Sequence, residues 1–236
     1  MIDPTPLWDF DDPAGSEQRF REAAEGAEGA DRPVLLTQVA RALGLQERYD
    51  EGHALLDDLA ASDDEVVARI ALERGRLLRS SGQPAEALPH FLAAADAARA
   101  AGLDVLRVDA LHMVALVGDP AEQVRLNEEA LAVAHASHDP RARDWDASLL
   151  NNIAMVHADA GDFDRALPLF EEALAARERI GDPGRTRVAR WMVAWALRHL
   201  GRTAEALEIQ RALKSELVAA GAEDPYVDEE LALLGG

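Results

Sequence analysis

The apolar residues of this chain recur at helical spacing, in pairs of segments separated by short turns. Alternating runs of β-branched residues, which predict strands, are almost absent, while alanine, leucine, glutamate and arginine dominate. Within each pair, the two segments are separated by a turn residue: Glu47, Gly82, Gly118, Gly161 and Gly201. The intervals are 35, 36, 43 and 40 residues. A period of this length with two helices per unit predicts a stacked array of helix pairs.

The same pattern predicts one all-α domain over residues 16–236, preceded by an extended acidic segment at residues 1–15 that contains three prolines. We expect five helix pairs, at residues 33–62, 63–102, 104–138, 145–181 and 185–221. A further helix is expected at Ser16–Glu28 and a closing helix at residues 225–234, which gives about twelve helices. The terminal helices would cover the apolar faces that a stacked array otherwise exposes.

Residues at the expected helix starts agree with this division. Ser62 followed by Glu65 predicts a capping box at the start of the second pair. Asp119-Pro120 and Asp224-Pro225 each place an N-cap acid before a first-turn proline.

The fourth pair has the most regular spacing. Its key positions are Ala154, Gly161, Phe163, Ala166, Phe170 and Ala173. The small residues at 154 and 166 allow two helices to cross closely, and Phe170 fills the space between them. These offsets resemble the tetratricopeptide repeat, and the resemblance extends more loosely over most of the chain. It implies a right-handed α-α superhelix (solenoid) of about five helix-turn-helix repeats with capping helices at both ends.

The third pair departs from this pattern, because Leu111, Gln123 and Asn127 stand where small and aromatic residues are expected. We therefore expect an irregular region there. Within the family, four stretches are similar to a bacterial subgroup, and that resemblance implies no particular activity. They are Leu7–Pro13, Asp109–Met113, Ser148–Asn152 and Ala189–Trp191.

Composition narrows the classes of function. The 236 residues include no cysteine and carry 44 acidic against 24 basic side chains, a net charge of -20. Without cysteine, disulfides, Fe–S clusters and thiol nucleophiles are excluded. The negative charge argues against nucleic acids and anionic membrane surfaces, which proteins bind mainly through lysine and arginine. No apolar stretch approaches the roughly 20 residues of a membrane span, and the N-terminus lacks the features of a signal peptide, so a cytoplasmic location is expected.

The sequence contains no recognisable catalytic or metal-binding motif. His135 and His138 stand three residues apart, but further ligands are absent nearby, and a solvated helix end explains them better. A phosphate-binding glycine loop, a nucleophile elbow and a dinucleotide fingerprint are all missing. We therefore expect no enzymatic activity, no cofactor and no metal.

A binding groove is the remaining candidate site. In a stack of helix pairs the first helix of each pair lines the concave surface. In this acidic chain those positions collect arginine, asparagine and tryptophan, and arginine and tryptophan are enriched at binding hot spots. The predicted groove residues are Arg41, Arg69, Arg76, Arg79, His112, Asn151, Asn152, Met155, Trp191, Trp195 and Arg198.

Parts of this set have a structural alternative. Trp191 and Trp195 stand four residues apart and can equally be core residues. The arginines between 69 and 79 can form a solvated face. Asn151 and Asn152 favour a functional role, because asparagine is a poor helix former. In some family members such asparagines act with lysine or arginine to clamp a terminal carboxylate, but the family's lysines are absent here.

These residues predict a non-enzymatic scaffold or adaptor that binds an acidic or carboxylate-bearing extended segment of a protein or peptide. Two other classes stay open: a self-associating assembly module, such as a homodimer, and a sensor of a signalling peptide or small molecule without an attached effector domain. The stretch Leu7–Asp12 adds a hypothesis, because it resembles a ligand for such a groove and can fold back into its own or enter a neighbour's. Alternatively, Trp8 and Phe10 only cap the apolar end of the first helix.

Overall fold

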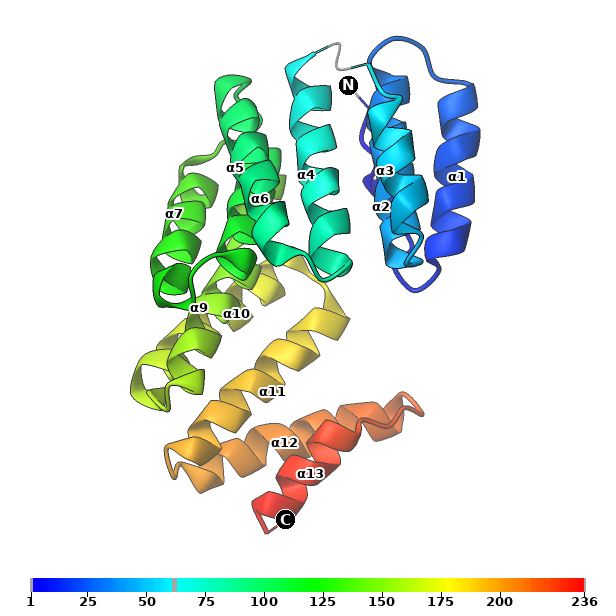
Figure 1. Ribbon diagram of the computed structural model, residues 1–236. Helices are drawn as coiled ribbons and strands as arrows, with labels where there is room; N and C mark the ends of the chain where they lie inside the picture. Colours follow the sequence, from blue (N-terminus) through cyan, green and yellow to red (C-terminus); the bar gives the residue numbers. More distant parts are fainter. Residues whose placement is uncertain (1, 61–62, 236) are drawn as a thin grey trace. The chain divides into compact units, whose positions relative to one another are not determined.

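The computed structural model describes residues 2–60 and 63–235, and within these ranges the regular structure is entirely helical (Figure 1). The all-α prediction is confirmed, and within each of the two units named next most consecutive helices pack against one another, as expected for helix pairs of a solenoid. The chain forms two compact units, Met1–Glu122 and Gln123–Gly236, called unit 1 and unit 2. The division into one domain over residues 16–236 stays a prediction.

Unit 1 begins with a short 3₁₀ helix, η1, at Thr5–Leu7. Its α-helices are α1 Pro13–Glu25, α2 Asp31–Leu45, α3 Tyr49–Asp57, α4 Asp64–Ser80, α5 Pro84–Ala100 and α6 Asp104–Val117. Neighbours in sequence pack together, and α2 also packs against α4. A second 3₁₀ helix, η2, spans Pro120–Glu122 at the end of the unit.

The core of unit 1 depends on close helix crossings. Gly75 of α4 faces Phe91 of α5, and the ring is fully buried against the glycine. Gly52 of α3 also lies close to Leu77 of α4. These small residues let the apolar faces of α3, α4 and α5 approach without a gap.

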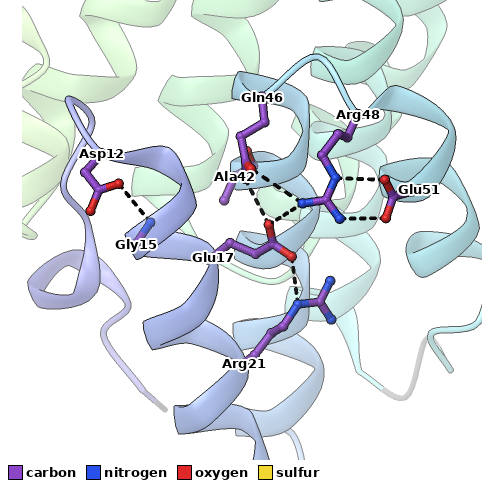
Figure 2. Close-up of polar contacts among 8 residues, drawn as sticks. All are labelled: Asp12, Gly15, Glu17, Arg21, Ala42, Gln46, Arg48 and Glu51. Carbon is purple, nitrogen blue, oxygen red and sulfur yellow. Dashed lines mark hydrogen bonds and ion pairs between the residues drawn. The ribbon is translucent and has the colours of Figure 1, made fainter.

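Helix α1 is fastened to α2 and α3 by the buried carboxylate of Glu17 (Figure 2). Arg21 and Arg48 donate hydrogen bonds to it at 2.8 and 2.7 Å, and Gln46 donates one at 2.9 Å. Burial acts to raise the pKa of Glu17, but the hydrogen bonds from Gln46 and Arg21 and the charge of Arg48 outweigh burial and lower it. Glu17 is therefore ionised at neutral pH and ties the three helices together.

Unit 2 continues the pattern of antiparallel helices. Its helices are α7 Gln123–Ala136, the single turn α8 Pro140–Arg143, α9 Asp146–Asp159, α10 Phe163–Ile180, α11 Pro183–His199, α12 Thr203–Ala219 and α13 Pro225–Leu233. Ala154, Ala166 and Phe170 are all buried where α9 and α10 pack, in the roles that the sequence predicts for them. Helix α13 covers Leu213 and Leu217 of α12 through Val227.

Most predicted helix starts agree with the structure. Asp224 caps α13, and its side chain accepts a hydrogen bond from the Tyr226 amide. Asp119 similarly accepts one from the Ala121 amide at η2. The predicted cap Ser62 lies outside the described residues, and the observed N-cap of α4 is Asp63, which accepts from the Val66 amide at 3.0 Å.

Two local features differ from the sequence prediction. Helix α1 starts at Pro13 instead of Ser16, because Asp12 caps it by accepting a hydrogen bond from the Gly15 amide (Figure 2). Gly118 is extended, with φ -73° and ψ -176°, whereas a helical-repeat turn needs a left-handed residue. The third predicted pair is thus irregular at this turn, and the boundary between the two units follows four residues later.

Candidate functional site

Arg76 in α4 lies at the centre of a charged cluster in unit 1. Its Nη1 donates to Glu73 Oε1 at 2.5 Å, and its Nη2 contacts both oxygens of Asp109 in α6 at 2.5 and 2.6 Å. The Arg76 side chain is 14% exposed and that of Glu73 only 2%. This ion-pair network is therefore shielded from water and holds α6 against α4.

The pKa shifts follow from this geometry. Burial acts to lower the pKa of Arg76, but the charges and hydrogen bonds of Asp109 and Glu73 raise it above its ordinary value. For Asp109, burial acts to raise the pKa, and the positive charges of Arg76 and Arg41 outweigh burial and lower it. Arg76 and Asp109 are therefore both ionised at neutral pH, so the charge of Arg76 is already balanced within the protein.

The predicted groove arginines of unit 1 are therefore of two kinds, those with an ion pair and those without one. Arg69 is paired with Glu65 of its own helix at 2.8 Å, and Arg76 is paired as described. Arg41 in α2 and Arg79 in the last turn of α4 form no ion pair and no side-chain hydrogen bond with any described residue.

The polar surface formed by α2, α4 and α6 is called the arginine face below. Its members are Arg41, Arg69, Arg76, Arg79 and His112, together with the carboxylates of Glu65, Glu73 and Asp109. Four guanidinium groups face three carboxylates, so the surface has a small excess of positive charge in an acidic chain.

Arg41 is the most confined of the arginines without an ion pair. Burial lowers the pKa of its guanidinium, and the nearby charge of Arg76 lowers it further, against the opposing charges of Glu73 and Asp109. Arg41 is partly buried, and a partly buried cation without a bonded carboxylate is a position where an anionic group gains from binding.

His112 of α6 completes the arginine face. Burial lowers the pKa of its imidazole, and the charges of Arg76 and Arg79 act in the same direction, against Asp109. His112 is therefore mainly neutral at pH 7 and can act as a hydrogen-bonding group.

Residues near the N-terminus lie against this face. The indole Nε1 of Trp8 donates to Gln38 Oε1 of α2 at 3.0 Å. The guanidinium of Arg41 lies 5.3 Å from the ring centres of both Trp8 and Phe10, within cation–π distance. Trp8 also packs edge-on against the buried Phe20 of α1. Trp8 therefore both caps the first helix and contacts the arginine face, so the two sequence hypotheses for it are compatible.

The remaining predicted groove residues lie in unit 2. Asn151, Asn152 and Met155 are partly buried on α9. Asn151 forms no side-chain hydrogen bond with a described residue, whereas Asn152 takes part in an interaction within the protein. Met155 packs against the buried cluster around Phe170. Asn151 is therefore the member of this set whose amide is available to a ligand.

The aromatic residues of α11 are largely committed to packing. Trp191 packs on the cluster of α12 and α13 and donates its indole N–H to the Tyr226 carbonyl at 3.2 Å. Trp195 packs edge-on against Phe163 and Phe170 of α10. Both residues are only partly buried, so the structure gives them core contacts and leaves part of each accessible to solvent.

Arg198 is also internally paired. Its guanidinium donates to both oxygens of Glu230 in α13 at 2.8 and 2.9 Å, and Glu230 is 4% exposed. The hydrogen bonds that Arg198 donates to Glu230 raise the pKa of Arg198. This pair fixes the closing helix, so Arg198 serves the fold of unit 2.

The predicted site residues thus occur as two sets, five in unit 1 and six in unit 2. Sequence reasoning missed the carboxylates that neutralise the arginines and the contact of Trp8 and Phe10 with Arg41. One sequence feature points to the carboxylates: Arg76–Asp109 and Arg198–Glu230 are separated by 33 and 32 residues, close to one repeat.

Two further observations concern other classes of function. No helix in the described part of the chain combines the length and apolarity of a membrane span. His135 and His138 are both exposed near the end of α7, and residues 2–60 and 63–235 contain no group of three potential metal ligands.

Comparison with known families gives two matches. A family model described as "Tetratricopeptide repeat" matches residues 145–213, and one described as "Tetratrico peptide repeat" matches residues 9–103. The matches fall in different units and together cover most of the helices. No protein of curated function matches the sequence.

Three solved structures illustrate the similarity of fold. A Pyrococcus horikoshii signal transduction ATPase with a tetratricopeptide repeat sensor is 14% identical with a TM-score of 0.74; the match covers 94% of this chain and 36% of the ATPase. A Rap protein complexed with Competence and Sporulation Factor is 12% identical, with a TM-score of 0.66 and coverage of 98% and 70%. The TPR-like repeats of a Podosopora anserina putative kinesin light chain are 18% identical, with a TM-score of 0.59 and coverage of 80% and 96%. At these identities the likeness concerns the fold.

Proposed function

The chain belongs to the tetratricopeptide repeat proteins, and we propose that it is a non-enzymatic scaffold or adaptor that binds an acidic or carboxylate-bearing extended segment of a protein or peptide. The fold is typically a non-catalytic scaffold. The Rap protein of the same fold was solved with Competence and Sporulation Factor bound, which supports a peptide as the kind of ligand. The proposal keeps the cytoplasmic location that the sequence favours.

The observation that carries the proposal is the presence of two arginines without an ion pair on the arginine face. Arg41 and Arg79 have no carboxylate partner among the described residues, while Arg69 and Arg76 are neutralised beside them. A ligand carboxylate can form charge-assisted hydrogen bonds with a guanidinium at no cost to an existing ion pair. Arg41 and Arg79 are therefore the proposed anchors, and Arg69, Arg76 and His112 shape the surface around them.

Unit 2 carries a separate set of candidate contacts for an extended segment. The amide of Asn151 can donate to and accept from the backbone of an extended segment. A partly apolar surface is offered by the partly buried residues Asn152, Met155, Trp191 and Trp195. Arg198 is excluded as an anchor because Glu230 already satisfies it.

A selection from a display library of random twelve-residue peptides tests the proposal. The immobilised full chain is expected to enrich peptides in which aspartate and glutamate outnumber lysine and arginine. A parallel selection with the Arg41→Gln, Arg79→Gln double variant should lose this enrichment.

The matched control is Arg99→Gln, which removes an exposed arginine of α5 in the same unit. It should enrich acidic peptides as the unmodified chain does. Enrichment of basic or uncharged peptides, or equal acidic enrichment by the double variant, would contradict the proposal.

A further inference from the structure

The segment Leu7–Asp12 lies across part of the arginine face. The rings of Trp8 and Phe10 stack with their centres 4.7 Å apart and nearly parallel planes, and Arg41 contacts both. Trp8 is also hydrogen-bonded to Gln38. One of the two proposed anchor arginines is thus covered by the protein's own aromatic residues.

Besides the stacked rings, the segment is held by the packing of Leu7 and Trp8 against the buried cluster of α1 and α2 and by a few hydrogen bonds. Arg19 donates to the Leu7 carbonyl at 3.0 Å, and the Asp9 backbone exchanges hydrogen bonds with the Ser16 hydroxyl at 2.9 and 2.8 Å. Phe10 is 52% exposed, and Asp9, Asp11 and Asp12 are exposed. A half-exposed ring over a charged group contributes little to a core, so Phe10 has the character of a ligand contact more than of a packing residue.

The segment covers Arg41 without neutralising it. Its rings supply a cation–π contact, but none of its carboxylates forms an ion pair with Arg41. A competing segment that offers the same two rings and also places a carboxylate on Arg41 would gain a charge-assisted hydrogen bond that the internal segment lacks.

We propose that residues 7–11 are an internal occupant of the binding surface on α2, and that the partner is an extended segment with two aromatic residues followed by carboxylates, which displaces them. This inference rests on the proposed function, since it names the partner class and the regulation of the same face. A partner binds this surface only if its affinity is high enough to displace the internal segment.

The expected loss of apparent partner affinity follows from the effective concentration of the tethered segment. A short tether gives an effective concentration on the order of 1 mM. For a free probe with a dissociation constant of about 0.1 mM, such an internal competitor weakens the apparent affinity about 10-fold.

The probe is a labelled synthetic peptide with the sequence of residues 5–14, which carries both rings and three carboxylates. It is titrated with the full chain and with the full-length Trp8→Ala, Phe10→Ala variant. The variant is expected to bind the probe about 10-fold more tightly. Adding Arg41→Gln to the variant should abolish the gain, and adding Arg99→Gln instead should preserve it. Equal affinity of the full chain and the variant would overturn the inference.

A second measurement covers the case in which loss of Trp8 disturbs the core around Phe20. Chymotrypsin cleaves after aromatic residues, so cleavage after Trp8 and Phe10 reports release of the segment in the unmodified chain. Arg41→Gln and excess acidic peptide from the display selection should each accelerate this cleavage several-fold, while Arg99→Gln should not.

These outcomes separate the two proposals. If selected acidic peptides bind and Arg79→Gln weakens them while cleavage of the segment stays unchanged, the internal-occupant inference fails and the proposed function stands. If the probe displaces the segment but the selection yields no acidic enrichment, the proposed function fails. A concentration-dependent dimer that the Trp8→Ala, Phe10→Ala variant loses would show exchange of segments between copies and overturn the internal arrangement.

Discussion

Glu47 holds a backbone conformation that normally requires glycine. Its φ is 61°, the one positive value at a non-glycine residue among those described, while Gly82, Gly161 and Gly201 occupy the corresponding turns with φ between 72° and 84°. The repeat spacing identifies Glu47 as a turn residue from the sequence alone. Its side chain is exposed, so strain at this turn is not offset by side-chain packing.

Glu47→Gly should therefore stabilise the protein. Relief of left-handed strain is worth about 1–2 kcal/mol, and the greater flexibility of glycine in the unfolded chain returns about half of it. We expect a net gain of about 0.5–1 kcal/mol and a thermal midpoint raised by about 2–3 °C. Thermal unfolding followed by circular dichroism measures the change.

The control is Glu86→Gly, at an exposed helical position in the first turn of α5. It should lower the midpoint, because glycine costs a helix close to 1 kcal/mol. If the thermal midpoint of Glu47→Gly falls, as that of the control should, the left-handed backbone at Glu47 is not strained.

The ion pairs show the limit of reasoning from residue types. Arg76 and Arg198 belong to the residue class that favours binding surfaces, but each is bonded to a carboxylate about one repeat further along the chain. Two such positions face each other only when neighbouring first helices have the matching register. Composition carries no information about that register. The sequence predicts that arginines gather on these helices, and the structure decides that Arg41 and Arg79 are the ones without an ion pair.

At the scale of elements, the crossing of α4 and α5 depends on the absence of a side chain at Gly75. A Cβ placed there would lie 2.5 Å from Cε1 and 2.7 Å from Cδ1 of Phe91, whose ring is fully buried. The sequence predicts this role, because small residues recur at the crossing positions of the repeats.

Gly75→Ala should destabilise unit 1 even though alanine favours helices. The helical preference contributes about 1 kcal/mol, while overpacking against a buried ring costs typically 1–3 kcal/mol, so we expect a net loss of about 1 kcal/mol. The thermal midpoint should fall by about 3 °C.

Gly26→Ala serves as the control for this variant, because a Cβ at Gly26 meets only a backbone oxygen at 4.0 Å. Its midpoint should stay the same or rise. Equal effects of the two substitutions would show that the α4–α5 crossing has room for a methyl group.

The third predicted pair shows where element prediction fails. Its first helix, α6, lies in unit 1 and its second, α7, in unit 2. The degenerate residues at Leu111, Gln123 and Asn127 mark this irregularity in the sequence, but the place of the boundary between the units follows from packing partners far apart in the chain.

For the whole molecule, the net charge of -20 argues against nucleic acids and anionic membranes as partners but does not describe the candidate site. The arginine face is close to neutral, because its carboxylates satisfy two of its four arginines. The proposed binding therefore depends on Arg41 and Arg79 and not on a broad basic surface. The contact of Trp8 and Phe10 with Arg41 could not be predicted from composition, because it depends on how Leu7–Asp12 packs against α1 and α2.

The most direct test is the affinity of one selected acidic peptide for four full-length forms of the chain: unmodified, Arg41→Gln, Arg79→Gln and Arg99→Gln, measured by calorimetry at two salt concentrations. Loss of one charge-assisted contact is worth about 1.5–3 kcal/mol, so Arg79→Gln should weaken binding at least 10-fold. Arg41→Gln should weaken it less, because the internal segment already competes for that residue. Arg99→Gln should leave the affinity unchanged, and added salt should weaken the unmodified chain more than Arg79→Gln. Equal affinities for all four forms would contradict the account.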